Sequence, residues 1–129
     1  MKEKVKEWMK YAELDYKSAL KLSEDENLTS TAAFHCQQSV EKYLKALIEN
    51  KDNPVPKVHT LQVLMNTVMK TYKIGYDHDV LDQINDVYID TRYPSSTGLI
   101  PEGIPKKETI TIFLSFVEDL KEKVEEILK

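Results

Sequence analysis

The chain has 129 residues, of which 41% are hydrophobic, and this length suits one globular domain with a real core but excludes two. Its three glycines leave little room for a turn-rich β architecture, so helix is the default expectation. A formal charge of −4 excludes a general positive sheath for nucleic acid and leaves only a local basic pocket for such a contact.

The single cysteine and the amino-terminal stretch indicate in which cellular compartment we expect the protein. Cys36 is the one cysteine and falls on the apolar side of a predicted helix, which is typical of a buried structural thiol in a reduced, cytoplasmic setting. The amino-terminal stretch lacks the apolar run of a signal peptide, and no window approaches the roughly 18 continuous apolar residues of a membrane span. We therefore expect neither export nor membrane insertion.

The first predicted helix covers about residues 3–22, where apolar residues recur at helical spacing and lysines and glutamates take the other side. Asp15 is its anomaly, because it lies in a row that steps by three and four residues and is otherwise apolar, namely Trp8, Ala12, Ala19 and Leu22. A carboxylate inside an apolar stripe is costly without a hydrogen-bond donor. We therefore expect another segment to supply a donor for Asp15.

The most distinctive stretch is a central helix, predicted from about residue 31 to residue 50. Its apolar residues gather in one sector that forms the core face: Ala32, Ala33, Cys36, Val40, Tyr43, Leu44 and Leu47. Along one border of this sector run His35, Gln38 and Lys42, and along the other run Gln37 and Glu41. Such polar groups at the edge of a core face indicate a half-buried network that needs partners from other segments.

Residues 23–30 are predicted as a loop whose Ser and Thr residues cap the central helix, and the Pro54 and Pro56 region ends that helix. A third helix is predicted from Leu61 to about Tyr72, with Thr60 as its cap. His59 then lies at a helix amino terminus, a position that suits an anion and disfavours a protonated imidazole.

A fourth helix is predicted at about residues 77–91, and a last helix from between residues 105 and 109 to about residue 127. The segment between them, RYPSSTGLIPEGIP, holds three of the five prolines and is predicted as a loop. Helical stretches with short connections predict an all-α fold: one domain over residues 1–129, an antiparallel up-and-down bundle of four to five helices.

Arg92 is the one arginine among eighteen basic residues, and it falls where the fourth helix meets the proline-rich loop. A guanidinium group offers a planar fork for a phosphate or carboxylate, which a lysine does not. A structural role is the alternative, in which Arg92 pairs with an internal acid such as Asp15 or Asp90 or caps helix carbonyls. The sequence leaves both open.

The three histidines, His35, His59 and His78, fall on different elements, and none shows the spacing of a metal-binding helix. We therefore expect no metal site and no cofactor. Each histidine has a structural reading: His35 as a satisfied group at a buried edge, His59 as a hydrogen bond at a helix start, and His78 as solvent-exposed. The common enzyme signatures, such as GxSxG, a phosphate-cradling glycine loop and CxxC, are absent.

Four places in the chain together resemble the HEPN domain, the "higher eukaryotes and prokaryotes nucleotide-binding" family. They are the Trp8…Ala12…Asp15-Tyr16…Ala19 opening, the AAFHCQQSVEKYLKALI helix, His59-Thr60-Leu61, and Arg92-Tyr93-Pro94. The resemblance covers nearly the whole length. It implies an antiparallel helical bundle that forms homodimers and works beside a small nucleotidyltransferase subunit in two-component, toxin–antitoxin-like operons.

The same family includes metal-independent ribonucleases, whose site is an arginine followed a few residues later by a histidine and is usually assembled across a dimer. This chain departs from that pattern, because no histidine follows Arg92 anywhere. The acid–base partner for a 2′-hydroxyl is therefore missing from its usual place, which argues against an enzyme. If the chain is a ribonuclease, His35 or His59 must supply the missing group next to Arg92.

The leading hypothesis is a HEPN domain that binds a nucleotide, another phosphate ligand or a nucleotidyltransferase partner through a polar pocket. Its candidate residues are Arg92 and Lys42 as cations, His35, Gln38 and His59 as orienting groups, Tyr93 as a stacking surface, and Asp15 as the acid that holds the cations. Two alternatives remain, a toxin-like ribonuclease that acts on RNA and a purely structural dimerisation module.

Overall fold

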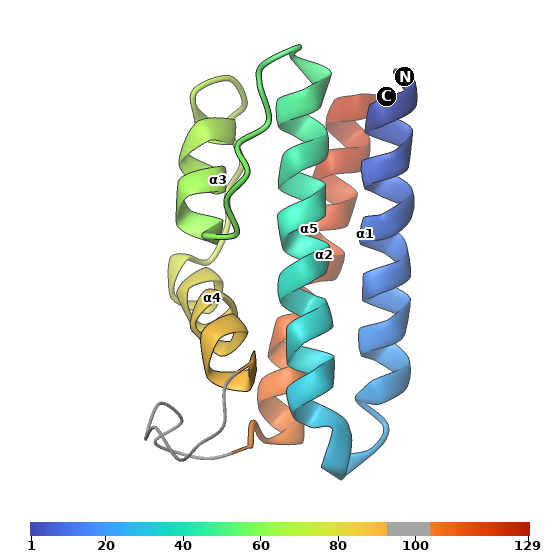
Figure 1. Cartoon of the computed structure of the whole chain (residues 1–129), viewed down its shortest axis with the longest axis vertical. Helices are drawn as coiled ribbons and strands as arrows, with labels where there is room; N and C mark the ends of the chain where they lie inside the picture. The colour runs from blue at the N-terminus through green and yellow to red at the C-terminus, as the bar shows by residue number, and fades with distance from the viewer. Residues whose placement is uncertain (93–103) are drawn as a thin grey trace.

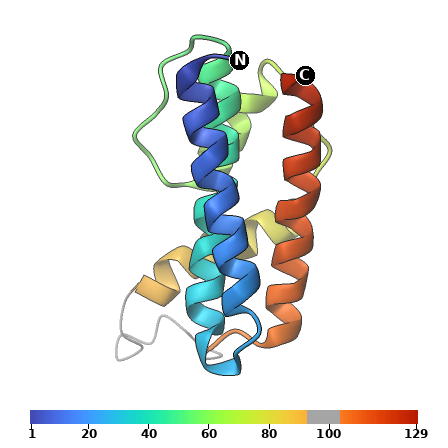
Figure 2. The same cartoon turned by 90° about the vertical axis from the view of Figure 1, so that its right-hand side faces the viewer.

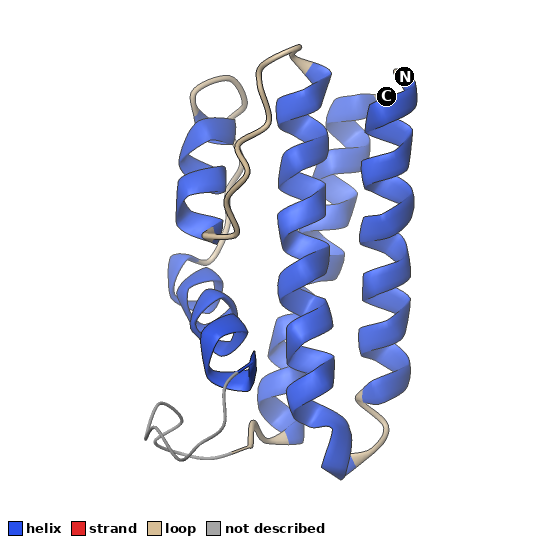
Figure 3. Ribbon diagram, viewed as in Figure 1, coloured by secondary structure: helices blue, strands red, loops and turns tan. Residues whose placement is uncertain are grey.

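The computed structural model describes the backbone of residues 1–92 and 104–129, and the side chains of residues 1–87 and 104–129. Five α-helices make up the described chain: α1 (Glu3–Leu22), α2 (Thr29–Asn50), α3 (Leu61–Met69), α4 (His78–Arg92) and α5 (Lys107–Leu128). No strand occurs within these ranges, and the predicted all-α fold is confirmed (Figure 3).

The three long helices α1, α2 and α5 stand side by side, while α3 and α4 follow one another along the side of α2 that is turned away from α1 (Figures 1 and 2). Helix α1 leads away from the end of the bundle where both termini lie, and α2 and α5 run back toward it. Each of the other four helices packs against α2. The predicted central helix is therefore the centre of the fold.

Burial along α2 explains why one narrow polar row stands out. Fourteen of its 22 residues are buried, including Cys36, Tyr43 and Leu44 of the predicted core face. The neighbours that cover α2 on both sides leave one half-buried patch. It consists of the adjacent residues Phe34 and His35, followed by Gln38 and Lys42 at steps of three and four residues. We call these four residues the α2 strip.

Two local predictions about helix starts were wrong. Thr60 makes no side-chain cap for α3. Instead, the side-chain oxygen of Asn85 in α4 accepts the Leu61 N–H at 2.9 Å, so the cap comes from a residue distant in sequence. Residues 23–30 are also not all loop, because a 3₁₀ turn (Glu26–Leu28) precedes α2 and α2 already begins at Thr29.

Cys36 lies fully buried among the apolar residues of the core. Burial raises the pKa of its thiol to about 12, so the reactive thiolate is absent from the folded protein at mildly alkaline pH. We expect a disulfide reagent to label Cys36 only as fast as the bundle opens. Rapid labelling of native protein, at the rate seen in denaturant, would contradict this burial.

Tyr43 is buried without exposure, and within the described residues its hydroxyl has no hydrogen-bond partner. Desolvation raises the pKa of this hydroxyl well above its usual range. A buried, unpaired hydroxyl is unfavourable, so Tyr43→Phe is expected to raise the free energy of unfolding by about 1 kcal/mol. Urea unfolding measures this change, and a loss of stability would show that the hydroxyl makes a favourable contact.

Candidate functional site

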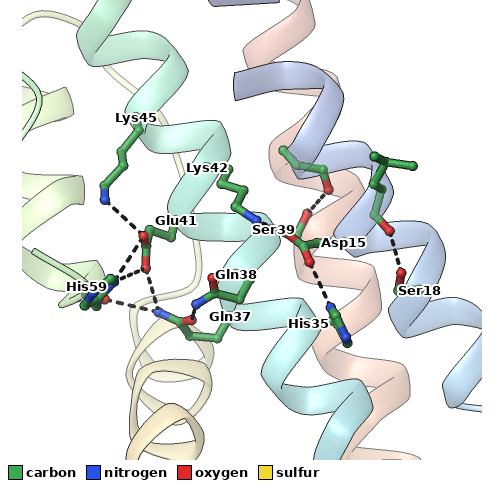
Figure 4. Close-up of polar contacts among 12 residues, drawn as sticks. Asp15, Ser18, His35, Gln37, Gln38, Ser39, Glu41, Lys42, Lys45 and His59 are labelled. Carbon is green, nitrogen blue, oxygen red and sulfur yellow. Dashed lines mark hydrogen bonds and ion pairs between the residues drawn. The ribbon is translucent and has the colours of Figure 1, made fainter. Parts of the chain in front are cut away.

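The carboxylate of Asp15 lies between α1 and α2 and holds two side chains of the α2 strip (Figure 4). Its Oδ1 lies 2.8 Å from Nδ1 of His35, and its Oδ2 contacts the ammonium group of Lys42. Close packing of the two helices makes this reach possible, and the Ser39 hydroxyl donates to the carbonyl of Ala12 at 2.8 Å beside it. The donor expected for Asp15 is therefore supplied twice by α2.

The hydrogen bonds of this cluster determine which of its side-chain atoms remain available to a ligand. An ionised carboxylate only accepts, so Nδ1 of His35 carries the proton that it donates to Asp15, and Nε2 is the nitrogen left for other contacts. The Asp15 side chain is 12% exposed, whereas those of His35 and Lys42 are 28% and 24% exposed. A buried acid thus positions an imidazole and an ammonium group that both reach solvent.

A second cluster centres on the carboxylate of Glu41, on the other flank of α2 (Figure 4). Glu41 accepts from Nζ of Lys45 at 3.0 Å and from Nδ1 of His59 at 3.0 and 3.2 Å. Gln37 donates to Glu41 at 3.4 Å and to the main-chain carbonyl of His59 at 3.1 Å. This cluster joins the segment that leads into α3 to the central helix.

The structure thus divides the predicted site residues between two flanks of α2. Asp15, His35 and Lys42 come together, whereas His59 binds the Glu41 carboxylate on the other side. Gln38 was placed with His35 from its spacing, yet its amide donates to Gln37 at 2.6 Å, toward the Glu41 cluster.

The two remaining predicted residues are the last residue of α4 and the residue after it in the sequence. Arg92 is the last residue of α4, which packs against α2, but its side chain lies outside the described residues. Tyr93 lies outside the described residues altogether.

Sequence reasoning missed Lys45, whose side chain is only 8% exposed beside Glu41. Its ammonium group also lies 5.6 Å from the centre of the Trp8 ring, a cation–π distance. Two signals pointed to it: the i, i+4 spacing from Glu41, and a lysine inside the otherwise apolar run YLKALI. A lysine in such a run needs a buried anion.

The described residues give less evidence for a metal site, a ligand-binding hollow or a membrane span. No three His, Cys, Asp or Glu side chains there are grouped so that they could hold a metal ion. Two open hollows of about 630 and 320 Å³ lie around the α1–α2 turn and the start of α5, away from both clusters. The larger hollow is lined by the ion pair of Lys21 and Glu24, whose side chains are 82% and 68% exposed. The charges of the α2 strip are instead held by a largely buried carboxylate, so the chemistry points to the strip. No helix in the described ranges is long and apolar enough to cross a membrane.

The fold and the polar network define a class of protein: a small helical-bundle domain whose central helix presents an imidazole and an ammonium group, both held by an acid from the first helix. Residues 5–128 match the family model of the HEPN domain. Because this match covers nearly the whole chain, the protein belongs to the HEPN family, as the sequence motifs predicted. Comparisons with curated proteins and with solved structures found no match.

Proposed function

We propose that this HEPN domain binds a nucleotide or another phosphate ligand on the α2 strip. The observation that carries the proposal is that Asp15 uses one carboxylate oxygen for Lys42 and the other for His35. A cation and an imidazole held next to each other at half-exposed positions form a preorganised place for a phosphate.

Each group has a role in this proposal. The Lys42 ammonium supplies positive charge, and Nε2 of His35 orients the ligand. The Phe34 ring lies edge-on to His35, with ring centroids 5.5 Å apart, and helps to hold the imidazole in place. Arg92 and Tyr93 complete the site in the proposal, and its support is that α4, whose last residue is Arg92, packs against α2 (Figures 1 and 2). His59 acts from the opposite flank by holding Glu41.

Thermal unfolding with AMP, CMP, GMP, UMP and inorganic phosphate tests this function. A ligand at 100 times its Kd stabilises the folded state by about 2.7 kcal/mol, so at least one compound is expected to raise the Tm clearly. If all five leave the Tm unchanged at millimolar concentration, the purely structural dimerisation module becomes the better account.

Family membership further supports a homodimer and a small nucleotidyltransferase subunit as the partner in a toxin–antitoxin-like pair. Light scattering of the purified protein is expected to give twice the 15.0 kDa chain mass. Co-expression with a nucleotidyltransferase encoded beside this chain is expected to yield a complex that survives gel filtration. A monomer at micromolar concentration, or separate elution of the two proteins, would count against these assignments.

A metal-independent ribonuclease is the second candidate, because the Asp15–His35 pair has the arrangement of an acid–base dyad, in which Nδ1 binds the carboxylate and Nε2 is left for the substrate. It predicts RNA cleavage in the presence of EDTA that is lost in both His35→Ala and Arg92→Ala. His78→Ala serves as the control, since His78 stacks on Tyr76 at 4.2 Å, outside both clusters. Intact RNA after incubation with pure wild-type protein would end this candidate.

A further inference from the structure

The buried amide of Gln37 has only one possible orientation. Its nitrogen faces the Glu41 carboxylate at 3.4 Å and the His59 carbonyl at 3.1 Å, and both of these groups can only accept hydrogen bonds. Glu41 is itself held by the Lys45 ammonium at 3.0 Å. Both N–H groups of Gln37 are therefore directed at acceptors, and its amide oxygen must face the other way.

The orientation of Gln37 determines that of Gln38. The oxygen of Gln37 needs a donor, and the amide nitrogen of Gln38 supplies it at 2.6 Å. Gln38 must therefore turn its own amide oxygen away from Gln37, and among the described residues no hydrogen bond to that oxygen occurs. A chain of hydrogen bonds that begins at a buried carboxylate thus leaves a fixed acceptor on the α2 strip.

We propose that Gln38 selects among nucleotides by this fixed amide oxygen, and that the α2 strip prefers bases that carry an exocyclic amino group. The inference rests on the proposed binding of a nucleotide phosphate by Lys42. Gln38 and Lys42 lie one turn apart, about 6 Å along the helix axis, so one nucleotide reaches both. The amino group of cytosine or adenine donates to the Gln38 oxygen.

The corresponding group of uracil or hypoxanthine is a carbonyl oxygen. This oxygen and the Gln38 oxygen both only accept hydrogen bonds, so they cannot bind each other. Neither oxygen then has a partner in the partly desolvated complex, and such a mismatch is what allows a site to reject an analogue. Glu41 and Gln37 are positioning residues in this account, because they act on the base only by holding Gln38 in one orientation.

The test compares CMP with UMP, and AMP with IMP, by calorimetric titration, because the sugar and phosphate are the same within each pair. We expect CMP and AMP to bind at least about tenfold more tightly than their partners, which corresponds to 1.4 kcal/mol. Gln38→Met and Gln37→Met are both expected to bring the ratio of the Kd values close to one. Gln62→Met, a glutamine of α3 bound to Asp82, is the control that keeps the wild-type ratio.

Gln37 is buried, so circular dichroism must show that its variant is folded, while the half-buried Gln38 provides a variant that does not depend on the core. Equal affinities for CMP and UMP in the wild-type protein would overturn the selectivity and leave phosphate binding intact. Absence of binding by all four nucleotides and by inorganic phosphate would instead overturn the proposed function.

Discussion

Replacing Glu41 by alanine is expected to lower the free energy of unfolding by about 3–5 kcal/mol, because the change leaves a buried cation without its anion. The Glu41 side chain is 5% exposed and that of Lys45 is 8% exposed, so water cannot replace the lost carboxylate without opening the bundle. Gln37 and His59 lose an acceptor at the same time. Urea unfolding followed by far-UV circular dichroism measures the loss.

A double variant separates the effect of the buried charge on stability from the effect of the lost side-chain volume. Replacing both Glu41 and Lys45 by methionine removes the uncompensated charge and keeps most of the side-chain volume, so we expect it to be more stable than Glu41→Ala. If Glu41→Ala costs less than about 1 kcal/mol, which is the range of exposed pairs, the ion pair is not buried as described.

Replacing Asp15 by alanine is expected to cost about 2 kcal/mol of unfolding free energy and to abolish tight phosphate binding. The stability loss reflects two hydrogen bonds to a charged group, and it stays below that of Glu41 because Lys42 and His35 are partly exposed and become hydrated. The loss of binding reflects free rotation of both side chains once the carboxylate is gone. Urea unfolding and phosphate titration of the same preparation measure the two effects.

Glu13→Ala is the matched control, since Glu13 is also a carboxylate of α1 that pairs with a lysine, Lys121, at 3.0 Å. That hydrogen bond lowers the pKa of Glu13, but the Glu13 side chain is 43% exposed, so the variant should lose little stability and no ligand affinity. Equal effects of Asp15→Ala and Glu13→Ala on phosphate affinity would show that Asp15 has no special role.

Most of the fold follows from helical periodicity in the sequence. The spacing of apolar residues places all five helices, and the carboxylate of Asp15 in an apolar row correctly indicates a contact with another segment. Periodicity shows which face a residue lies on because that face is a local property of one helix. It also identifies α2 as central, since polar groups border its apolar sector on both sides.

Partner choice between distant segments does not follow from periodicity. Asn85 caps α3 from the neighbouring helix α4. His59 binds Glu41 rather than the cluster around His35. Both contacts depend on how α3 and α4 pack along α2, which no local pattern specifies. The orientation of the Gln38 amide depends on the two hydrogen bonds that fix Gln37 and on the one that joins Gln38 to Gln37. It is therefore determined only once the whole network has formed. The placement of Arg92 and Tyr93 in the site remains a prediction.

Calorimetric titration of AMP into the wild-type protein, Lys42→Met and Lys121→Met tests the central claim most directly. The two lysines are closely matched, because each pairs with a carboxylate of α1 and their side chains are 24% and 25% exposed. We predict that Lys42→Met raises the Kd for AMP at least about tenfold, as expected for a lost charge-assisted hydrogen bond, while Lys121→Met leaves it unchanged. The same Kd in all three proteins would contradict phosphate binding on the α2 strip.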